Sequence, residues 1–260
     1  MKNCTLLVSS CDNYEDLWGP FFSLLKKYWI SIDCPIMLIT DGKKFSSNGL
    51  QIQCPLDYTN KQRTWSECVI EAIGHIDTEY ILFMLDDFWI KEPVDDILID
   101  KCIGYLDSDK NAGTFCLRHQ PDFKLHEESK FSEFVRRPKS EPYRITTQVS
   151  VWRKSYLNKI LRKHESVWDF ETFAKYRSRL FYPERIYLIK PTVKMPIVYH
   201  SGGVLYRGKY VMPYLKEFKN DLLGIDLSRG YYLNKPSNYD GLITPKYDFW
   251  SITKSLFPKY

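Results

Sequence analysis

The sequence lacks the cysteine and histidine spacings that mark disulfide frameworks and zinc sites. Its seven cysteines are an odd number, scattered along 260 residues with no C-x-x-C pair. Disulfide-stapled secreted domains and structural zinc sites both depend on close, repeated cysteine spacing. We therefore expect free, reduced thiols and a cytoplasmic protein.

Long apolar runs are also missing. No stretch approaches the roughly 20 consecutive apolar residues of a membrane-spanning helix. The opening segment, residues 1–10, has too short an apolar run for a signal peptide and no processing site. We find no internal repeat and no low-complexity tract.

Glycine is absent where common nucleotide-binding loops require it. The segment 9–14, which follows the first predicted strand, contains none of the 12 glycines. This excludes a dinucleotide fingerprint, a P-loop and a glycine-rich methyl-donor loop at this turn. A nucleotide would have to be held here by side chains such as Ser10 and Asp12, with a metal as the partner of its diphosphate.

Charge and aromatic content narrow the partners. A net charge of +5 without a clustered basic stripe favours anionic ligands or an anionic membrane surface and argues against a nucleic-acid binder. Aromatic residues make up 16% of the chain, a content that suits stacking on sugars or bases, although most rings must serve packing.

Strands and helices alternate over residues 1–204. Short apolar runs predict strands at 4–10, 35–41, 51–55, 80–85, 112–117 and 146–152, with 184–189 and 192–200 as a hairpin-like pair. Helical spacing predicts helices at 15–28, 64–76, 94–106 and 154–164 and another from 166. This alternation predicts an α/β fold with a mainly parallel sheet sandwiched by helices. Residues 119–144 are expected to form a long loop or a strand insertion at the rim of an acceptor site.

The chain changes character after residue 204. Residues 205–260 are aromatic and basic and are interrupted by proline and glycine, with a predicted helix at 213–223. We expect a C-terminal appendage packed on the main domain. Its composition suits peripheral contact with an anionic bilayer, or equally a homodimer contact.

An acidic pair ends the most apolar strand of the chain. The run Tyr80–Leu85 is followed directly by Asp86 and Asp87, and Asp41 likewise ends the second predicted strand. Open α/β sheets bind ligands at the carboxyl ends of their strands. Adjacent carboxylates at such a place repel each other and favour a compensating cation, so they predict a divalent metal that carries a diphosphate. The alternative is an acidic turn that caps the next segment.

Two further groups of residues are candidates for chemistry. Asp169 and Glu171 lie in the first turn of a predicted helix, where the helix dipole alone would favour them, but Trp168 and Phe170 flank Asp169 and would suit a general base. His200 ends a predicted strand just before Gly202 and Gly203, a setting that favours a ligand role over a purely structural one.

Three segments together resemble the bacterial GT-A-fold glycosyltransferases encoded with capsule, O-antigen and other surface-polysaccharide genes. They are Glu79-Tyr-Ile-Leu-Phe-Met-Leu-Asp-Asp-Phe88 with the preceding Trp65, Gln148-Val-Ser-Val-Trp152, and Val167-Trp-Asp-Phe-Glu171. The opening Ser10-Cys-Asp-Asn-Tyr14 with Trp18, and the pair Tyr28-Trp29, fit the same pattern. The resemblance covers about residues 1–203.

The resemblance implies transfer of a sugar from a nucleotide-diphosphate sugar to a hydroxyl of a saccharide acceptor, with inversion, at the inner face of the cell membrane where the acceptor is lipid-linked. It implies that Asp86 and Asp87 hold Mn²⁺ or Mg²⁺ on the donor diphosphate, and that His200 is a metal or phosphate contact. It further implies that Asp169, or Glu171, is the base. The sequence departs from the usual Asp-any-Asp motif because Phe88 stands at the last acidic position, so the metal rests on Asp87 or is replaced by positive side chains.

Candidates for such positive side chains are Lys61, Arg63, Arg207 and Lys209. Two other functions stay open. A sugar nucleotidyltransferase shares this sheet but normally needs a basic glycine-rich loop after the first strand. A non-catalytic carbohydrate-binding relative is kept open by Phe88.

Overall fold

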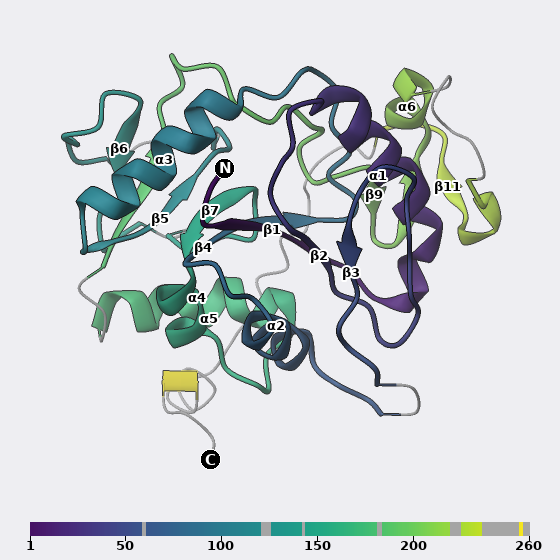
Figure 1. Ribbon diagram of the computed structural model, residues 1–260, viewed down its shortest axis with the longest axis horizontal. Coiled ribbons are helices and arrows are strands. Elements are labelled where there is room, and N and C mark those ends of the chain that lie inside the picture. The colour runs from purple at the N-terminus through teal and green to yellow at the C-terminus, as the bar shows by residue number, and fades with distance from the viewer. Residues whose placement is uncertain are drawn as a thin grey trace.

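The computed structural model describes residues 1–58, 61–120, 126–141, 144–180, 184–218, 225–235 and 255–256. Within these ranges one eight-stranded sheet runs through the middle of the main domain, with helices on both faces (Figure 1). Its spatial order is β3-β2-β1-β4-β7-β5-β8-β6. The strands are β1 (Cys4–Ser9), β2 (Ile36–Leu38), β3 (Ile52–Gln53), β4 (Tyr80–Leu85), β5 (Ala112–Cys116), β6 (Phe134–Arg136), β7 (Ser150–Arg153) and β8 (Arg185–Ile189).

The sheet has a parallel half and a mixed half. Strands β3, β2, β1 and β4 are all parallel, whereas β7 runs antiparallel between β4 and β5, and β6 runs antiparallel to β8 at the edge. The pair β5 and β8 is again parallel. The predicted α/β fold with helices on both sides of the sheet is thereby confirmed, and parallel pairs outnumber antiparallel ones.

Each face of the sheet has its own helices. In Figure 1, α1 (Glu15–Tyr28) and α3 (Asp96–Ser108) cover one face, and α2 (Trp65–Gly74), α4 (Lys154–Ile160) and α5 (Val167–Leu180) cover the other. α2 begins with a capping box between Thr64 and Glu67, which satisfies two backbone N–H groups that a helix start leaves without partners.

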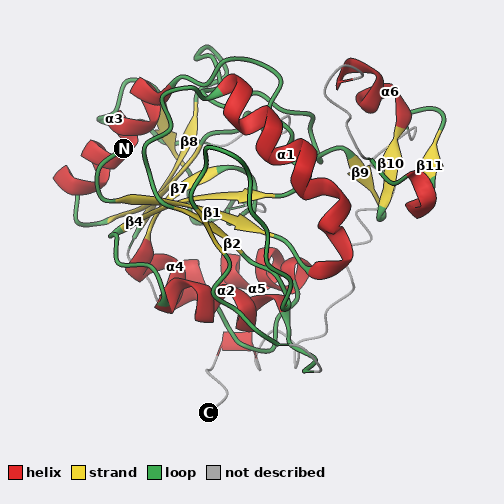
Figure 2. Cartoon of the chain, turned by 45° about the vertical axis from the view of Figure 1, so that its right-hand side comes forward, coloured by secondary structure: helices red, strands yellow, loops and turns green. Residues whose placement is uncertain are grey.

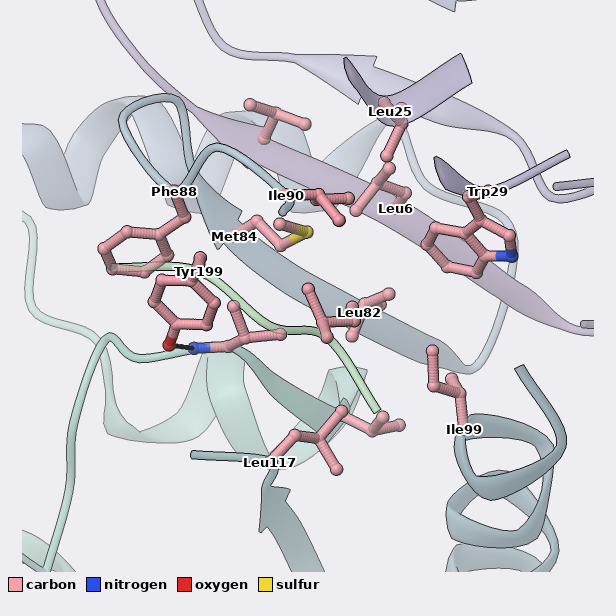
Figure 3. Packing of buried hydrophobic residues seen from close by; sticks show 14 of the residues in the cluster. Leu6, Leu25, Trp29, Leu82, Met84, Phe88, Ile90, Ile99, Leu117 and Tyr199 are labelled. Atoms are coloured by element: carbon pink, nitrogen blue, oxygen red, sulfur yellow. Dashed lines mark hydrogen bonds between the residues drawn. The ribbon is translucent and has the colours of Figure 1, made fainter. Parts of the chain in front are cut away.

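The central strands explain why the core is so apolar. β1 and β4 pair along their whole length, from Cys4 opposite Tyr80 to Ser9 opposite Leu85. Alternate residues face opposite layers: Leu6 and Leu82 pack under α1 and α3 (Figure 3), whereas Leu7 joins the core under α2, α4 and α5. Each fully buried side chain of this kind contributes roughly 1.5–3 kcal/mol. The polar side chains of β1, Thr5 and Ser9, lie near its two ends.

The C-terminal part adds a small three-stranded sheet beside α1 (Figure 2). It comprises β9 (Leu205–Tyr206), β10 (Lys209–Val211) and β11 (Tyr231–Tyr232). The remaining short elements are α6 (Met212–Leu215) and the 3-10 turns η1 (Asp12–Tyr14), η2 (Lys216–Phe218) and η3 (Leu227–Arg229). The buried side chains of Tyr210, Leu215 and Phe218 join the same core cluster as α1.

The structure corrects one predicted strand pair. Residues 192–200 form no strand, and β8 pairs with β5 and β6 instead. Pro196 lacks the N–H that a ladder needs, and the segment instead accepts single hydrogen bonds from Lys91 N to Val198 O (2.9 Å) and from Asp95 N to Pro196 O (3.0 Å).

Other element boundaries also shift. The strand predicted from residue 146 begins at Ser150, and the helix predicted at 213–223 ends at Leu215 and continues as η2, its residues 219–223 lying outside the described ranges. The predicted insertion at 119–144 contributes β6, so its described part includes an edge strand. No helix in the described ranges is long and apolar enough to cross a bilayer.

Candidate active site

Polar side chains gather where β1 and β4 end side by side. Asp86 follows β4 directly, and its side chain accepts a short hydrogen bond from Ser10 Oγ. Trp18 Nε1 donates to the same Ser10 oxygen at 2.6 Å, so a buried ring of α1 fixes the hydroxyl. Burial raises the pKa of Asp86 to about 7 despite the Ser10 hydrogen bond. This carboxyl is therefore poised to change charge near neutral pH.

Asp87 is held differently, by the chain that follows residue 200. Its backbone oxygen accepts a hydrogen bond from Val204 N at 2.9 Å, and Gly203 lies against its carboxylate. Gly203 has φ +79°, and a Cβ there would overlap the Asp87 carboxyl group. Within the described residues the buried Asp87 Oδ1 has no hydrogen-bond partner. Burial and the neighbouring Asp86 raise the pKa of Asp87 well above its usual range.

An unpartnered carboxylate oxygen beside a second acid fits a divalent cation, which would relieve both the burial and the repulsion. Asp86 and Asp87 therefore suit the predicted metal. However, no group of three His, Cys, Asp or Glu side chains in the described part of the chain forms a ready metal site. The third predicted ligand, His200, is not brought into such a group, and any further ligands would come from the substrate or water.

His200 has its own surroundings on the C-terminal side. Its ring stacks on Tyr214 at 3.9 Å between centroids, and its Nε2 lies 3.4 Å from Glu217 Oε2. Burial, with Lys91 nearby, lowers the pKa of His200 to about 4. The imidazole is therefore neutral at physiological pH, and its contacts join residue 200 to η2.

Asp12 and Asp41 interlock the loops after β1 and β2. Asp12 Oδ1 accepts from Asp41 N (2.8 Å) and Gly42 N (3.3 Å), and Asp12 N donates to Asp41 Oδ2 (3.0 Å). Both predicted nucleotide contacts are thus brought together at the carboxyl edge. The hydrogen bonds give Asp12 a structural role as well, because it orders a loop that has no glycine before Gly42.

An open cavity of about 500 Å³ lies beside Asp12, between η1, the start of α1 and the C-terminal sheet. Its lining residues are Asp12, Asn13, Glu15, Asp16, Gly208, Asp226, Ser228 and Arg229. Arg229 closes one side: its Nε donates to Asp16 Oδ2 at 2.9 Å, and its guanidinium covers the Tyr14 ring at 4.7 Å. Tyr210 Oη donates to the same Asp16 oxygen at 2.5 Å. This Arg229–Asp16–Tyr210 cluster ties the small sheet to α1.

Phe88 is part of the core. Its ring stacks on Tyr199 at 4.5 Å (Figure 3), and Tyr199 Oη donates to Gln148 Oε1 at 2.9 Å. The guanidinium of Arg118 lies over the Tyr199 ring, 4.9 Å from its centroid, and donates to Tyr199 O at 2.9 Å. The residue that breaks the acidic motif therefore serves to anchor the segment before His200.

Asp169 forms a capping box at the start of α5. Its Oδ2 accepts from Ser166 N (3.1 Å) and Ser166 Oγ (2.7 Å), and Asp169 N donates back to Ser166 Oγ (3.2 Å). The flanking rings do not enclose it, because Trp168 is 65% exposed whereas Phe170 is buried. The hydrophobic setting expected for this carboxylate is thus wrong for Trp168, and its role as a base stays a prediction.

Glu171 lies two residues further along α5, against the segment that leads into β7. Its Oε1 accepts from Thr147 N (2.6 Å), Thr147 Oγ1 (2.7 Å) and Thr146 Oγ1 (3.2 Å). Because β7 is antiparallel to β4, with Ser150 opposite Phe83, this segment lies at the carboxyl edge of β4. Glu171 is therefore a fixed carboxylate on the far side of the sheet edge from Asp12.

The other predicted cations have local partners. Arg63 lies 4.8 Å from the Tyr58 ring and 3.6 Å from Glu67 Oε1. Arg207 covers its neighbour Tyr206, and Lys209 approaches the Tyr232 ring at 6.0 Å. Lys61 is exposed. A cation that sequence reasoning missed is Arg118, although its position directly after a buried strand carried the same signal as the Asp pair.

Comparison with known proteins is informative for the fold alone. No protein-family profile and no curated protein matches the sequence. Among solved structures, the mannosyltransferase PcManGT from Pyrobaculum calidifontis, in complex with GDP-Man and Mn²⁺, is similar over 79% of this chain and 58% of its own, with 13% identity and a TM-score of 0.51. The match shows a shared GT-A-type fold.

Two further structures match more weakly. TarS 1-349 of S. aureus, in complex with UDP-GlcNAc, has 13% identity and a TM-score of 0.48 over 73% of this chain and 56% of its own. Glucosyl-3-phosphoglycerate synthase from Mycobacterium tuberculosis, with Mn²⁺ and UDP-glucose, has 8% identity and a TM-score of 0.45 over 76% and 71%. The chain spans just over half the length of the matched PcManGT and TarS 1-349 chains.

Proposed function

We propose that this protein is a glycosyltransferase that moves a sugar from a nucleotide-diphosphate sugar to a hydroxyl of a saccharide acceptor. The observation that carries the proposal is the pair Asp86 and Asp87 at the carboxyl end of β4, with one buried carboxylate oxygen of Asp87 unpartnered in the described structure. In a sheet of this topology that position is where ligands bind, and the PcManGT structure of similar fold holds GDP-Man and Mn²⁺.

Asp86 and Asp87 would hold Mn²⁺ or Mg²⁺, which when bound would neutralise charge on the leaving diphosphate. The chain's own contribution is to fix these acids. Ser10 and Trp18 orient Asp86, and Gly203 leaves room for Asp87. Asp12, Asp41 and the cavity beside them suit the nucleotide part of the donor.

The acceptor would approach from the β7 side, where a carboxylate base must take the hydroxyl proton as the new bond forms. Glu171 suits this task because three hydrogen bonds from Thr146 and Thr147 all reach its Oε1. These bonds fix the carboxylate and do not involve Oε2, which would be the oxygen that takes the proton. Asp169 is the second candidate. To act as a base, its carboxylate would have to give up the hydrogen bond from Ser166 Oγ or use its other oxygen. A base opposite the leaving diphosphate gives a single displacement and inversion.

The biological setting we propose is surface-polysaccharide synthesis of the capsule or O-antigen type, with a lipid-linked acceptor. The C-terminal sheet supports contact with a membrane surface, since Leu233 is 71% exposed and Tyr231 48% exposed close to Lys209 and Lys235. Rings and cations of this kind suit an anionic headgroup layer.

This membrane contact is tested by sedimentation with vesicles containing anionic phosphatidylglycerol. We expect binding at low ionic strength, release by raised salt, and weaker binding for Leu233→Ser. A salt-resistant dimer in solution with no vesicle binding would favour the homodimer contact instead.

The proposed reaction is tested by titrating the protein with UDP and GDP, with and without Mn²⁺, and by measuring hydrolysis of the matching nucleotide sugars. We expect one nucleotide diphosphate to bind more tightly with Mn²⁺ and its sugar to be slowly released to water. Binding without any turnover would favour the non-catalytic carbohydrate-binding alternative. Release of pyrophosphate from a nucleoside triphosphate and a sugar phosphate would favour the nucleotidyltransferase.

A further inference from the structure

A cluster of buried arginines lies between the end of β6 and the start of β7, away from the acidic pair. Arg137 and Arg144 are each only 3% exposed, and Arg179 of α5 lies against the same segment. Arg144 donates to the backbone oxygens of Arg137 and Glu184, and Arg179 donates to Ser140 O (3.1 Å) and Glu141 O (2.7 Å). We call these three residues the arginine cluster.

The arginine cluster has unused donors. In the described structure the buried atoms Arg137 Nε, Arg137 Nη1, Arg144 Nε and Arg179 Nε have no hydrogen-bond partner. Buried guanidinium groups are normally hydrogen-bonded on every N–H, because a lost bond in a dry site is costly. Within the described residues, four unpartnered donors on three neighbouring side chains, against one unpartnered acceptor nearby, Glu184 Oε2, point to a missing acceptor.

The charges around the cluster also fail to balance. Arg137 lies 3.7 Å from Glu141 and donates to Gln120 Oε1 at 2.8 Å. The negative charge of Glu171 also raises the pKa of Arg137. Glu184 is paired with Lys159 at 2.9 Å. Within the described residues Arg144 donates to backbone oxygens, so three arginines and Lys159 face the carboxylates of Glu141, Glu171 and Glu184. Burial lowers the pKa of Arg137, and it lowers the pKa of Arg144 to about 10.

The missing group is therefore an anion with several acceptor oxygens. Guanidinium forks match phosphate and carboxylate oxygens in pairs. A phosphate suits the cluster better than a carboxylate, because it offers more oxygens to the unused donors and more charge to the excess cation. The cluster lies near Glu171, whose Oε1 holds Thr146 and Thr147, two and three residues after Arg144.

We propose that the arginine cluster binds a phosphate ester group carried by the acceptor saccharide. The proposal rests on the proposed function, because it names a property of the acceptor for that transfer. Arg137 and Arg144 would receive the phosphate while the acceptor hydroxyl lies by Glu171. The acidic half of the sheet edge would keep the donor, and the acceptor would be selected by its charge.

The chain offers a matched pair of variants. Arg136 precedes Arg137 but is paired with Glu127 and has a side chain that is 41% exposed. Arg136→Gln removes a charge next to the cluster without touching its donors. Arg137→Gln removes the central donors, and Arg179→Gln removes a half-buried member near the end of α5.

The binding experiment is calorimetric titration of the full chain with glycerol 1-phosphate at constant ionic strength, with glycerol as the neutral control. We expect wild type and Arg136→Gln to bind glycerol 1-phosphate alike, and Arg179→Gln and Arg137→Gln to bind it about tenfold or more weakly. No binding to wild type, or equal binding to Arg136→Gln and Arg179→Gln, would overturn the proposal. Arg179→Gln keeps the test valid even where Arg137→Gln does not fold.

Two further arms separate this proposal from the proposed function. A nucleotide diphosphate with Mn²⁺ should bind the Arg179→Gln variant as tightly as it binds wild type. If it does not bind wild type at all, the proposed function fails, whereas the phosphate site of the arginine cluster is unaffected. With labelled donor sugar, saccharides that carry a phosphate ester should be used in preference to their unphosphorylated forms. Equal use of both forms would overturn the acceptor assignment.

Discussion

The two halves of the sheet are flanked by opposite charge. On the parallel half, the ends of β1, β2 and β4 present Asp12, Asp41, Asp86 and Asp87. On the mixed half, Arg118 follows β5 at the carboxyl edge, and the arginine cluster lies beside the start of β8, where Arg137 N donates to Ile186 O and Arg144 donates to Glu184 O. The boundary falls between β4 and β7, where the strand direction reverses.

The difference shows how one sheet could treat two anionic substrates separately. Carboxylates need a cation to meet a diphosphate, whereas guanidinium groups meet an oxyanion directly. Under our proposal the donor is therefore recognised through a metal and the acceptor without one. Exchanging the charge of one half should disturb one substrate and spare the other.

The largest effect should come from Asp87→Asn. The amide keeps the shape and the fold but cannot supply the charge that we assign to the acidic half. We expect sugar transfer to fall by about a thousandfold or more, with Asp86→Asn impaired less severely. Steady-state turnover and circular dichroism would check this, and near wild-type turnover of folded Asp87→Asn would remove the pair from the mechanism.

The base assignment on the mixed half comes next. Loss of a general base costs on the order of a hundred- to ten-thousand-fold in rate, and it should leave nucleotide affinity unchanged because the base faces the acceptor. We expect this signature for Glu171→Gln and a smaller rate loss for Asp169→Asn, whose main cost is the capping box. If Asp169→Asn alone shows the signature, the order of the two candidates is reversed.

A pair of glycine variants separates contact with Asp87 from backbone strain. Gly203 and Gly208 both have positive φ, +79° and +75°, but only a Cβ at residue 203 would meet Asp87, whereas one at 208 would come no closer than 3.9 Å to Tyr14 Oη. Each alanine should cost about 1–2 kcal/mol of stability from the left-handed backbone. Only Gly203→Ala should also weaken Mn²⁺ binding, by roughly tenfold. Equal Mn²⁺ affinities in titration calorimetry would show that Gly203 serves the turn alone.

The smallest effect should appear in the dependence of stability on pH. Burial raises the pKa of Asp86 to about 7 and that of Asp87 well above its usual range, so the folded protein binds protons that the unfolded chain releases above about pH 4. Stability without metal should therefore fall as the pH rises from about 4 through 7. Mn²⁺ should raise Tm more at pH 8 than at pH 5, because metal binding requires the deprotonated acids. Scanning calorimetry with EDTA or Mn²⁺ checks this, and an Mn²⁺ shift of Tm that is no larger at pH 8 would contradict it.

Much of the fold was predictable from local patterns in the chain. The runs Cys4–Ser9 and Tyr80–Leu85 are buried on both faces, so their composition indicated central strands. The antiparallel β7 and the edge strand β6 were not distinguished, because strand direction depends on long-range pairing that a short run does not encode. The strand predicted at 192–200 was wrong because this apolar segment lies beside residues 91–95 with single hydrogen bonds and forms no ladder.

The candidate site was predictable only where a residue type carries its own signal. Adjacent acids at the end of a buried strand are recognisable in the sequence as candidate ligands. Arg118, which follows β5, occupies the same kind of position and could have been recognised in the same way. The surroundings of Asp169 and His200 were not readable, since they depend on the exposed side of Trp168 and on the return of Tyr214 and Glu217. The arginine cluster was equally hidden, because consecutive Arg136 and Arg137 look alike in sequence and only tertiary packing buries the second.

The Arg229–Asp16–Tyr210 cluster also sets the order in which the protein can be completed during synthesis. Asp16 leaves the ribosome early, yet its guanidinium partner lies 213 residues further along the chain. Until that arginine emerges, the carboxylate of Asp16 and the face of Tyr14 stay exposed to water, and the wall of the cavity beside Asp12 is unfinished. The nascent chain can build its sheet from the N-terminus onwards, but the wall of this cavity is completed only after Arg229 has emerged. A copy truncated before Arg229 would therefore lack this wall of the cavity, and under our proposal it should bind the nucleotide sugar more weakly.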